Sequence, residues 1–377
     1  MSDMMKYFTE ISNLVRGALV KDEQVVSAYT QQLIEKLTSD GEVLAAKGLT
    51  EQLSKSKSNS TMIGQKSVSF SRPVPVEKDN RFELADRTHP QLEESIVFLP
   101  DNLDKKVNAF VSYLGKKDEL NALNIPINPT LLLFGPPGTG KSKLAANIAA
   151  RVGLPLVTAR ADALISSYLG STSKNIRSLM EYAKSEPCVL FLDEFDSIAK
   201  ARDDKNEIGE LKRVVVSLLQ NIDTLKDTIV IAATNHAHLL DPAIGRRFHY
   251  KMELLPPLAQ ERSKIFESLL LRFTTSKADL ATLASISEGM TGAEIEIATF
   301  EYLRSMIVEG VDYSSYDLMK SILSAKYHWL DFNSDTERSA NMFKLKQLNS
   351  ELYTGKLLGL LWNVTPSYVS RLIKDHK

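Results

Sequence analysis

The stretch LLLFGPPGTGKS, from Leu131 to Ser142, constrains this chain more than any other part of its sequence. An apolar run leads directly into a turn with three glycines, and Lys141 and Ser142 follow. Glycines let a backbone wrap closely around phosphate groups, and the N-terminus of a following helix attracts anions. The stretch fits the pattern G-x-x-x-x-G-K-[ST] between a predicted strand and a predicted helix, which makes a chance match a poor explanation. It therefore predicts a nucleotide site that binds phosphate groups.

Two side chains of this stretch have separate expected roles. Lys141 would reach the β- and γ-phosphates, and Ser142 would be a ligand of Mg²⁺. The residues that we expect to bind the nucleotide are Gly135, Pro136, Pro137, Gly138, Thr139, Gly140, Lys141, Ser142, Leu144 and Asp193.

A second apolar run, from Val189 to Leu192, ends in the two acids Asp193 and Glu194. Asp193 at the end of a strand can hold Mg²⁺, and Glu194 is then placed to take a proton from an attacking water. Two acids at the start of a helix would be the alternative, but that alternative does not explain the buried run before them. The pattern favours hydrolysis of the nucleotide over binding alone.

A third apolar run begins at Ile229 and ends at Asn235. The amide of Asn235 could orient the attacking water or touch the γ-phosphate. It could equally be a turn residue, since asparagine is common in turns.

Short apolar runs and amphipathic segments alternate after residue 91, which predicts an α/β fold with a parallel sheet covered by helices on both faces. We expect strands at 130–134, 155–159, 188–193, 228–234 and 249–254. We expect helices at 101–115, 141–152, 173–185, 207–222, 259–271, 277–287 and 292–308.

The chain divides into five expected parts. Residues 1–53 show helical periodicity and predict a small helical module, and residues 54–90 predict a linker that is irregular up to about Pro90. Residues 91–257 would form the large nucleotide-binding part, residues 258–310 a helical lid, and residues 311–377 a helical extension.

Five motifs in order resemble those of the AAA clade of the AAA+ ATPases, which are P-loop NTPases. They are GPPGTGKS, VLFLDEFDSIA (189–199), IAATN (231–235), LLDPAIGRRF (239–248) and GMTGAEI (289–295). The resemblance covers about residues 91–310. It implies ATP hydrolysis with Mg²⁺, a helical lid, and Asn235 as a sensor of the nucleotide. It also implies that Ala293 stands where other AAA+ groups carry a second-sensor arginine.

Arg246 and Arg247 match the segment that supplies an arginine finger to the neighbouring subunit's nucleotide in this family. A guanidinium there would neutralise charge on the transferred phosphoryl group. His249-Tyr250 replaces the usual Asp-Arg pair and the segment is short, so the sequence leaves open which arginine inserts. A basic pair on the surface is the alternative. A finger acting on a neighbour implies a homo-oligomer, and the resemblance suggests a ring or spiral hexamer.

The segment around Tyr168, Leu169 and Gly170 resembles the pore loop of AAA proteins that thread polypeptides. A large amphipathic ring at a loop tip can grip an extended chain without reading its side chains, and a glycine lets the loop swing. Tyr168 and Leu169 could instead pack on their own domain. The resemblance favours remodelling of a protein partner, with residues 1–53 as a recruiting module or an aid to assembly.

The C-terminal stretch from Leu357 to Lys374 resembles a helix-turn-helix. Gly359 suits a close helix crossing, Asn363 a left-handed turn, and Pro366 the first turn of a second helix. Residues 338–377 carry seven Lys and Arg against two Asp and Glu, a surplus that favours phosphate binding. The candidate DNA-facing residues are Ser367, Tyr368, Ser370, Arg371 and Lys374. A helical hairpin that packs on the lid or on a neighbour is an equal alternative.

Bulk properties exclude some classes of protein. Lys and Arg number 46 and Asp and Glu 47, so no polybasic field covers the chain. Cys188 is the one cysteine, which excludes an internal disulfide and fits the cytoplasm. No apolar stretch approaches the roughly 20 residues of a membrane helix, and no signal peptide or Cys/His metal cluster is expected. A DNA-associated ATPase and a nucleotide-switched scaffold, of bacterial defence or toxin–antitoxin type, stay open beside protein remodelling.

Overall fold

The computed structural model describes residues 30–34, 36–37, 74–76, 83–125, 128–160, 169–196, 221–222, 224–225, 227–236, 245–332, 334 and 337–374. The chain forms two compact units, Met1–Ser71 and Arg72–Lys377. In the first unit, residues 30–34 and 36–37 are helical, and Leu33 and Leu37 are buried. The rest of the module predicted for residues 1–53 lies outside the described residues.

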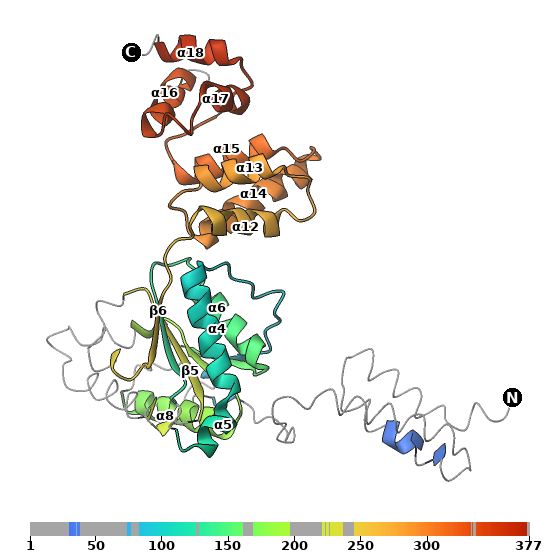
Figure 1. Ribbon diagram of the computed structural model, residues 1–377, viewed down its shortest axis with the longest axis vertical. Coiled ribbons are helices and arrows are strands. Elements are labelled where there is room, and N and C mark those ends of the chain that lie inside the picture. The colour runs from blue at the N-terminus through green and yellow to red at the C-terminus, as the bar shows by residue number, and fades with distance from the viewer. Residues whose placement is uncertain are drawn as a thin grey trace. The chain divides into compact units, whose positions relative to one another are not determined.

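The second unit contains a six-stranded sheet with the order β1-β3-β4-β5-β2-β6 (Figure 1). Its five parallel strands are those expected from the apolar runs, within one residue at each end. They are β2 (Thr130–Phe134), β3 (Leu156–Ala159), β4 (Val189–Leu192), β5 (Ile229–Thr234) and β6 (Tyr250–Glu253). The predicted α/β class is confirmed.

The sheet is mixed rather than wholly parallel, because β1 (Ala85–Thr88) pairs antiparallel with β3. The expectation of irregular chain up to about Pro90 is therefore wrong at these four residues. The sequence Ala-Asp-Arg-Thr has no apolar alternation, and only Ala85 is buried. Pairing with β3 and the hydrogen bond from Arg87 Nη1 to Tyr182 Oη, at 2.9 Å, hold this edge strand in place.

Alternate residues of the strands face two separate cores, as the period of a strand requires. One core contains Leu131, Leu133 and Phe191 and is covered by α4 (Asp101–Gly115) and α6 (Lys141–Val152). The other contains Leu132 and Leu190 and is covered by α8 (Leu169–Ser185). The predicted covering of both faces is thus confirmed, and a short helix, α5 (Lys117–Ala122), follows α4. Of the helix expected at 207–222, only residues 221 and 222 are described, and both are helical.

Cys188 lies directly before β4 and is buried, as its apolar surroundings predict. Burial raises the pKa of its thiol to about 12. A thiol with this pKa carries almost no thiolate at neutral pH, so Cys188 is a small core residue rather than a nucleophile.

Every element described after β6 is a helix (Figure 1). These helices are α12 (Ala259–Leu269), α13 (Lys277–Ile286), α14 (Gly292–Glu309), α15 (Ser315–Lys326), α16 (Arg338–Leu348), α17 (Gly355–Leu361) and α18 (Pro366–Lys374). One hydrophobic cluster runs through them, from Phe266 in α12 to Ile373 in α18. The predicted lid and the predicted C-terminal extension therefore share a core.

The turn between α17 and α18 has the geometry expected from its residues. A Cβ on Gly359 would lie 2.6 Å from the Val364 carbonyl oxygen, so only glycine fits there. Asn363 has a φ of 52°, in the left-handed region, and Pro366 is the first residue of α18. Val369 is fully buried between these helices.

No helix within the described ranges is both long enough and apolar enough to span a membrane.

Candidate functional site

The loop from Gly135 to Gly140 joins the end of β2 to the start of α6. Gly135, Gly138 and Gly140 have φ values of 140°, 75° and 93°, which residues with a side chain rarely adopt. A Cβ on Gly135 would lie 2.0 Å from the carbonyl oxygen of Leu254, just after β6. The glycines thus allow both the turn and a close approach of two backbone segments.

The side chain of Lys141 is folded back over this loop and is 7% exposed. Its Nζ donates to the carbonyl oxygens of Gly135 at 2.9 Å and Pro136 at 2.8 Å. Burial lowers the pKa of Lys141, and the carboxylates of Asp193 and Asp196 oppose that shift. The ammonium therefore lies within the curve of the loop, where a phosphate group could replace the two carbonyls as its partner.

Ser142 and Asp193 meet although they are far apart in sequence. The Ser142 hydroxyl donates to Asp193 Oδ2 at 2.8 Å, and the backbone N–H of Glu194 donates to Asp193 Oδ1 at 2.8 Å. Glu194 has an exposed side chain and a φ of 47°, which is uncommon for a residue other than glycine. The structure thus brings the two acids to the start of α6.

The oxygen atoms of Ser142 and Asp193 suit Mg²⁺, which prefers oxygen ligands and keeps several waters. Within the described part of the chain, no group of three or more His, Cys, Asp or Glu side chains could hold a metal ion. A magnesium ion at Ser142 and Asp193 would therefore need further oxygens from a nucleotide or from water.

Asn235 follows β5, which lies between β4 and β2, so it reaches the same edge of the sheet as the loop and the acids. Its side chain is exposed. The turn at Asn235 is held by Thr234, which donates from Oγ1 to Asp196 Oδ1 at 3.0 Å and accepts from the His236 N–H at 3.0 Å. Sequence reasoning did not single out Thr234 or Asp196, although Asp196 lies within the acidic motif.

The start of α14 contacts the phosphate loop directly. The Ala293 N–H donates to the Gly138 carbonyl at 3.1 Å, and a Cβ on Gly138 would lie 2.7 Å from Thr291 Oγ1. Thr291 caps α14, with its hydroxyl and the Glu294 carboxylate completing a capping box. The helix α14 therefore contacts the loop that is expected to bind phosphate.

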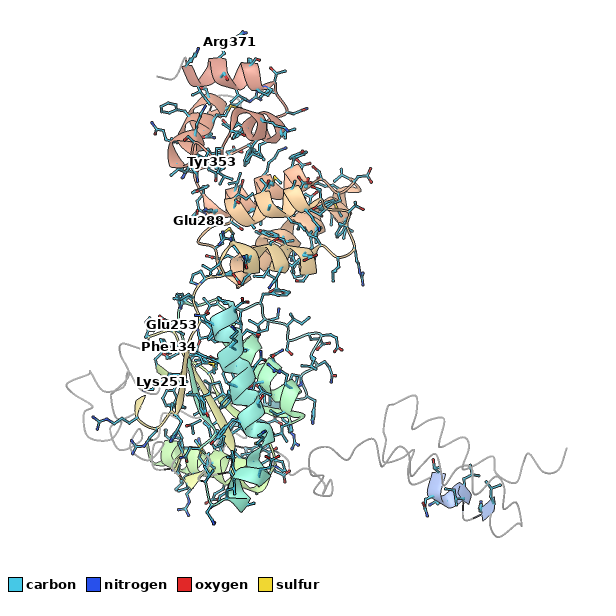
Figure 2. All side chains as sticks on the ribbon, viewed as in Figure 1. Phe134, Lys251, Glu253, Glu288, Tyr353 and Arg371 are labelled. Atoms are coloured by element: carbon cyan, nitrogen blue, oxygen red, sulfur yellow. The ribbon has the colours of Figure 1, made fainter. Side chains whose placement is uncertain are left out.

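Arg246 and Arg247 lie at the amino ends of the parallel strands, whereas the phosphate loop and the acids lie at the carboxyl ends. The reason is that both arginines precede β6, and β6 runs parallel to β2. Arg246 is exposed and Arg247 is half-buried, and the Arg247 carbonyl accepts a 2.9 Å hydrogen bond from Thr130 Oγ1. The four steps from Thr130 to Phe134 span about 13 Å at a typical strand rise. Figure 2 shows Glu253 beside Phe134 at the loop end of these strands and Lys251 further along β6, and the arginines precede Lys251 in the chain. The structure thus does not bring these arginines to their own chain's loop.

Five other predicted residues need separate mention. Leu144 is 1% exposed and its side chain lies in the core under α6, and its expected contact with the nucleotide stays a prediction. The phosphate-loop pattern does not distinguish inward from outward side chains in the first helical turn. Tyr168 lies outside the described residues. Leu169 and Gly170 are the first residues of α8, so the expectation that they belong to a loop before a helix at 173–185 is wrong. Thr139 closes the loop by donating to the Pro136 carbonyl at 2.9 Å.

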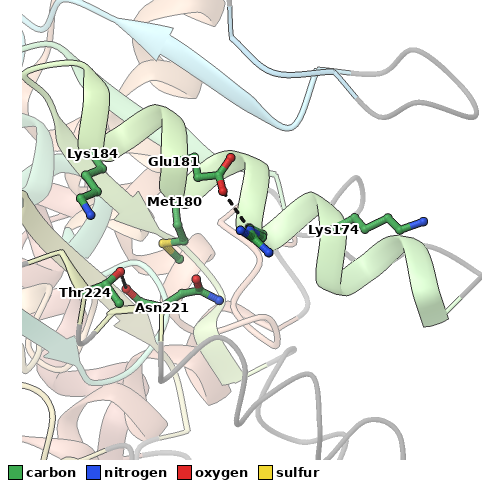
Figure 3. Close-up of a pocket in the computed structure, with 7 residues that line it drawn as sticks. Lys174, Met180, Glu181, Lys184, Asn221 and Thr224 are labelled. Atoms are coloured by element: carbon green, nitrogen blue, oxygen red, sulfur yellow. Dashed lines mark hydrogen bonds and ion pairs between the residues drawn. The ribbon is translucent and has the colours of Figure 1, made fainter.

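A hollow of about 490 Å³ lies elsewhere, along α8 (Figure 3). Lys174 and Lys184 line it, together with Arg177, which pairs with Glu181 at 2.9 Å, and with Asn221. None of the predicted nucleotide-binding or catalytic residues is among its lining residues, so this hollow is not the nucleotide site.

A mostly parallel sheet, a glycine loop between β2 and α6, and paired acids after β4 define a P-loop nucleoside triphosphatase. Residues 131–255 match the family described as "ATPase family associated with various cellular activities (AAA)". This chain belongs to the AAA ATPase family, and it is an ATP hydrolase.

Individual relatives support this assignment. The "Uncharacterized AAA family ATPase y4kL" of Sinorhizobium fredii is 33% identical over 306 residues, which cover 78% of this chain and 91% of that protein. A "Proteasome-activating nucleotidase" of Methanococcus vannielii is 30% identical over 69% of this chain and 67% of its own length. A "Cell division cycle protein 48 homolog" of Archaeoglobus fulgidus is 36% identical over 46% of this chain, which covers a quarter (25%) of that protein.

The contact between α14 and the loop leads to a matched pair of substitutions. Gly138→Ala and Gly153→Ala both place alanine at a left-handed φ, 75° and 68°, and each should cost ~1–2 kcal/mol of folding free energy. Only Gly138→Ala also displaces Thr291, since nothing lies within 4 Å of a Cβ on Gly153. We expect Gly138→Ala to lower ATP turnover about tenfold, and Gly153→Ala to leave turnover unchanged. Steady-state ATPase assays and urea denaturation measure both effects, and equal turnover in the two variants would contradict the role of the contact.

Proposed function

We propose that this chain hydrolyses ATP at sites shared between neighbouring copies of itself and uses the cycle to remodel a protein partner. The observation that carries the proposal is the separation of two groups of residues by the length of β2. Lys141, Ser142 and Asp193 lie at one edge of the sheet, and Arg246 and Arg247 lie at the other. Arginines that act in catalysis from that edge must reach the nucleotide of another subunit.

Within one subunit, the loop and the acids would divide the chemistry between them. Backbone N–H groups of the loop and the start of α6 bind phosphates, and Lys141 exchanges the Gly135 and Pro136 carbonyls for phosphate oxygens. Ser142 and Asp193 would hold Mg²⁺, which supplies charge neutralisation at the phosphates. Glu194 accepts a proton from the attacking water.

Asn235 would orient that water from the neighbouring strand. The hydrogen bonds of Thr234 to Asp196 and His236 fix the turn that presents the amide. This placement favours the sensor role over that of a simple turn residue.

The neighbouring subunit would contribute an arginine to the same nucleotide. A guanidinium stabilises charge that develops on the transferred phosphoryl group. If every subunit contributes an arginine to the next one, the subunits follow one another head to tail around an axis. Such an arrangement fits a ring or spiral. A hexamer is the assembly that we propose.

The partner is proposed to be a polypeptide that Tyr168 and Leu169 grip in a central channel. The pore-loop resemblance and the printed name of the proteasome-activating nucleotidase relative support a protein partner. The large part predicted at 91–257, extended by β1, would drive the loop, and the lid at 258–310 would respond to the nucleotide. The module at 1–53 would recruit partners through the part of the predicted linker 54–90 that precedes β1.

A second candidate function is DNA association through the extension at 311–377. In α18, Val369 and Ile373 are buried while Ser367, Tyr368, Ser370, Arg371 and Lys374 form its open side. Figure 2 shows Arg371 on this helix. A cationic helix that follows a tight turn can lie against phosphates or base edges.

Mixing of two inactive variants tests the shared site. Glu194→Gln removes the proton acceptor, and Arg246→Ala with Arg247→Ala removes both arginines, so each variant alone should turn over ATP at least about a hundredfold more slowly. Co-expressed with two different tags and purified together, the two variants should regain a measurable part of wild-type turnover. A mixed assembly as inactive as its parents would contradict the shared site.

Substitution of Tyr168 tests the protein partner. Tyr168→Ala should leave basal ATP turnover within about twofold of wild type and abolish ATP-dependent movement of a fluorescently labelled unfolded polypeptide, because the gripping ring is gone. Tyr168→Phe keeps the ring and serves as the control, and it should retain movement. Retention of movement by Tyr168→Ala would contradict the gripping role.

Salt dependence tests the second candidate. For double-stranded DNA, Arg371→Ala with Lys374→Ala should reduce the slope of log binding constant against log salt by about 2, one unit for each lost phosphate contact. Lys356→Ala, an exposed lysine on α17, is the control and should leave the slope unchanged. Equal slopes in wild type and in the double variant would remove α18 as a DNA-binding element.

A further inference from the structure

The side chain of Thr130, the first residue of β2, binds the segment from Arg246 to His249, which we call the arginine segment. Its Oγ1 donates to the Arg247 carbonyl at 2.9 Å and accepts from the His249 N–H at 3.1 Å. Thr130 itself is 6% exposed, and both bonds are partly buried. A buried hydroxyl that satisfies two backbone groups of one segment fixes the position of that segment.

The Thr130 hydroxyl continues the hydrogen bonding between β2 and β6 by one residue. Backbone pairing of β2 with β6 starts at Leu131 opposite Tyr250, so Thr130 and His249 are one step beyond it. On its other side, Thr130 is paired with Val230 of β5, near the middle of the sheet. The anchor is therefore rigid, and the segment attached to it takes its position from the sheet.

Neighbouring contacts hold the same segment after Arg247. Phe248 is buried, with its ring 5.9 Å from that of Phe195. The ring nitrogens of His249 lie 3.2 Å from Asn128 Nδ2 and 3.4 Å from Thr130 Oγ1. The Thr130 bond fixes the Arg247 carbonyl itself, whereas Arg246 is exposed.

We infer that Thr130 is a positioning residue for the segment that carries Arg246 and Arg247, and that its bond to the Arg247 carbonyl fixes where this segment presents an arginine to the neighbouring subunit's nucleotide. This inference rests on the proposed function, in which an arginine acts between subunits. Loss of the hydroxyl leaves the Arg247 carbonyl and the His249 N–H without their buried partner, and the segment shifts. A displacement of about 1 Å at a catalytic group can lower turnover by as much as a hundredfold.

Kinetic constants separate positioning from general damage to the sheet. Thr130→Val keeps the shape of the side chain and should lower kcat about tenfold, with KM for ATP and binding of a fluorescent ATP analogue within about twofold of wild type. Thr130→Ser restores the hydroxyl and should restore kcat. Wild-type kcat in Thr130→Val, or a loss of ATP binding in step with kcat, would overturn the inference.

Thr228→Val is the matched control. Thr228 is also buried at the amino edge of the sheet, directly before β5, and its hydroxyl donates to the Ala183 carbonyl at 3.1 Å. The substitution removes the same kind of bond but does not touch the arginine segment. It should lower the urea midpoint about as much as Thr130→Val does and leave kcat unchanged. An equal loss of kcat in both variants would overturn the inference.

Mixed assemblies then locate the defect within the subunit. Thr130→Val mixed with Glu194→Gln should regain turnover, because the first supplies an intact phosphate loop and the second an intact arginine segment. Thr130→Val mixed with the double variant Arg246→Ala, Arg247→Ala should not, because neither supplies a working arginine. Recovery in this second mixture would show that Thr130 acts on its own phosphate loop, and it would overturn the inference.

Failure of the proposed function has a different signature. If arginines do not act between subunits, the double variant Arg246→Ala, Arg247→Ala mixed with Glu194→Gln stays inactive, whatever Thr130→Val does. Recovery in that mixture together with wild-type kcat in Thr130→Val would retain the shared site and reject the role of Thr130.

Discussion

The strand β2 is the element on which the rest of the structure depends. It lies between β5 and β6, and residues on its two faces enter the two cores that lie under the covering helices. Its carboxyl end continues into the phosphate loop, and its first residue holds the arginine segment through a buried hydroxyl. The length of β2, about 13 Å, thus separates the phosphate loop, which would receive an arginine from a neighbour, from the segment of Arg246 and Arg247, which would donate one.

The phosphate loop is also where the sheet and the helices meet. Gly138 accepts a hydrogen bond from the Ala293 N–H at the start of α14, and α14 belongs to the hydrophobic cluster that continues to α18. A change at the loop on nucleotide binding or release would therefore act on a body of helices with a single core. This arrangement offers a physical route from ATP hydrolysis to movement of the C-terminal helices.

Much of the sheet could be predicted from sequence, because four of the parallel strands, β2, β3, β4 and β5, are short and mostly buried runs followed by a polar or glycine residue. The same runs located Asp193 and Asn235, since parallel strands present their carboxyl ends at one edge. Gly359 and Asn363 also predicted the turn between α17 and α18, because few other residues fit a close helix crossing or a left-handed φ. In these cases a local requirement of the backbone selects the residue type.

Other features could not be predicted because they arise only from tertiary contacts. Residues 85–88 form a strand through pairing with β3 and have no strand pattern of their own. The inward position of Leu144 follows from how α6 packs, which the phosphate-loop pattern does not specify. Thr130 is 117 residues from Arg247 in sequence, so no local signal connects them.

The central claim is that one subunit cannot complete its own catalytic site. The most direct measurement is ATP turnover per subunit over a wide range of protein concentration, with assembly followed by analytical ultracentrifugation in the same buffer. The account predicts that turnover per subunit rises in step with assembly and falls toward zero when the protein is dilute enough to be monomeric. Constant turnover per subunit from monomer to assembly would contradict it.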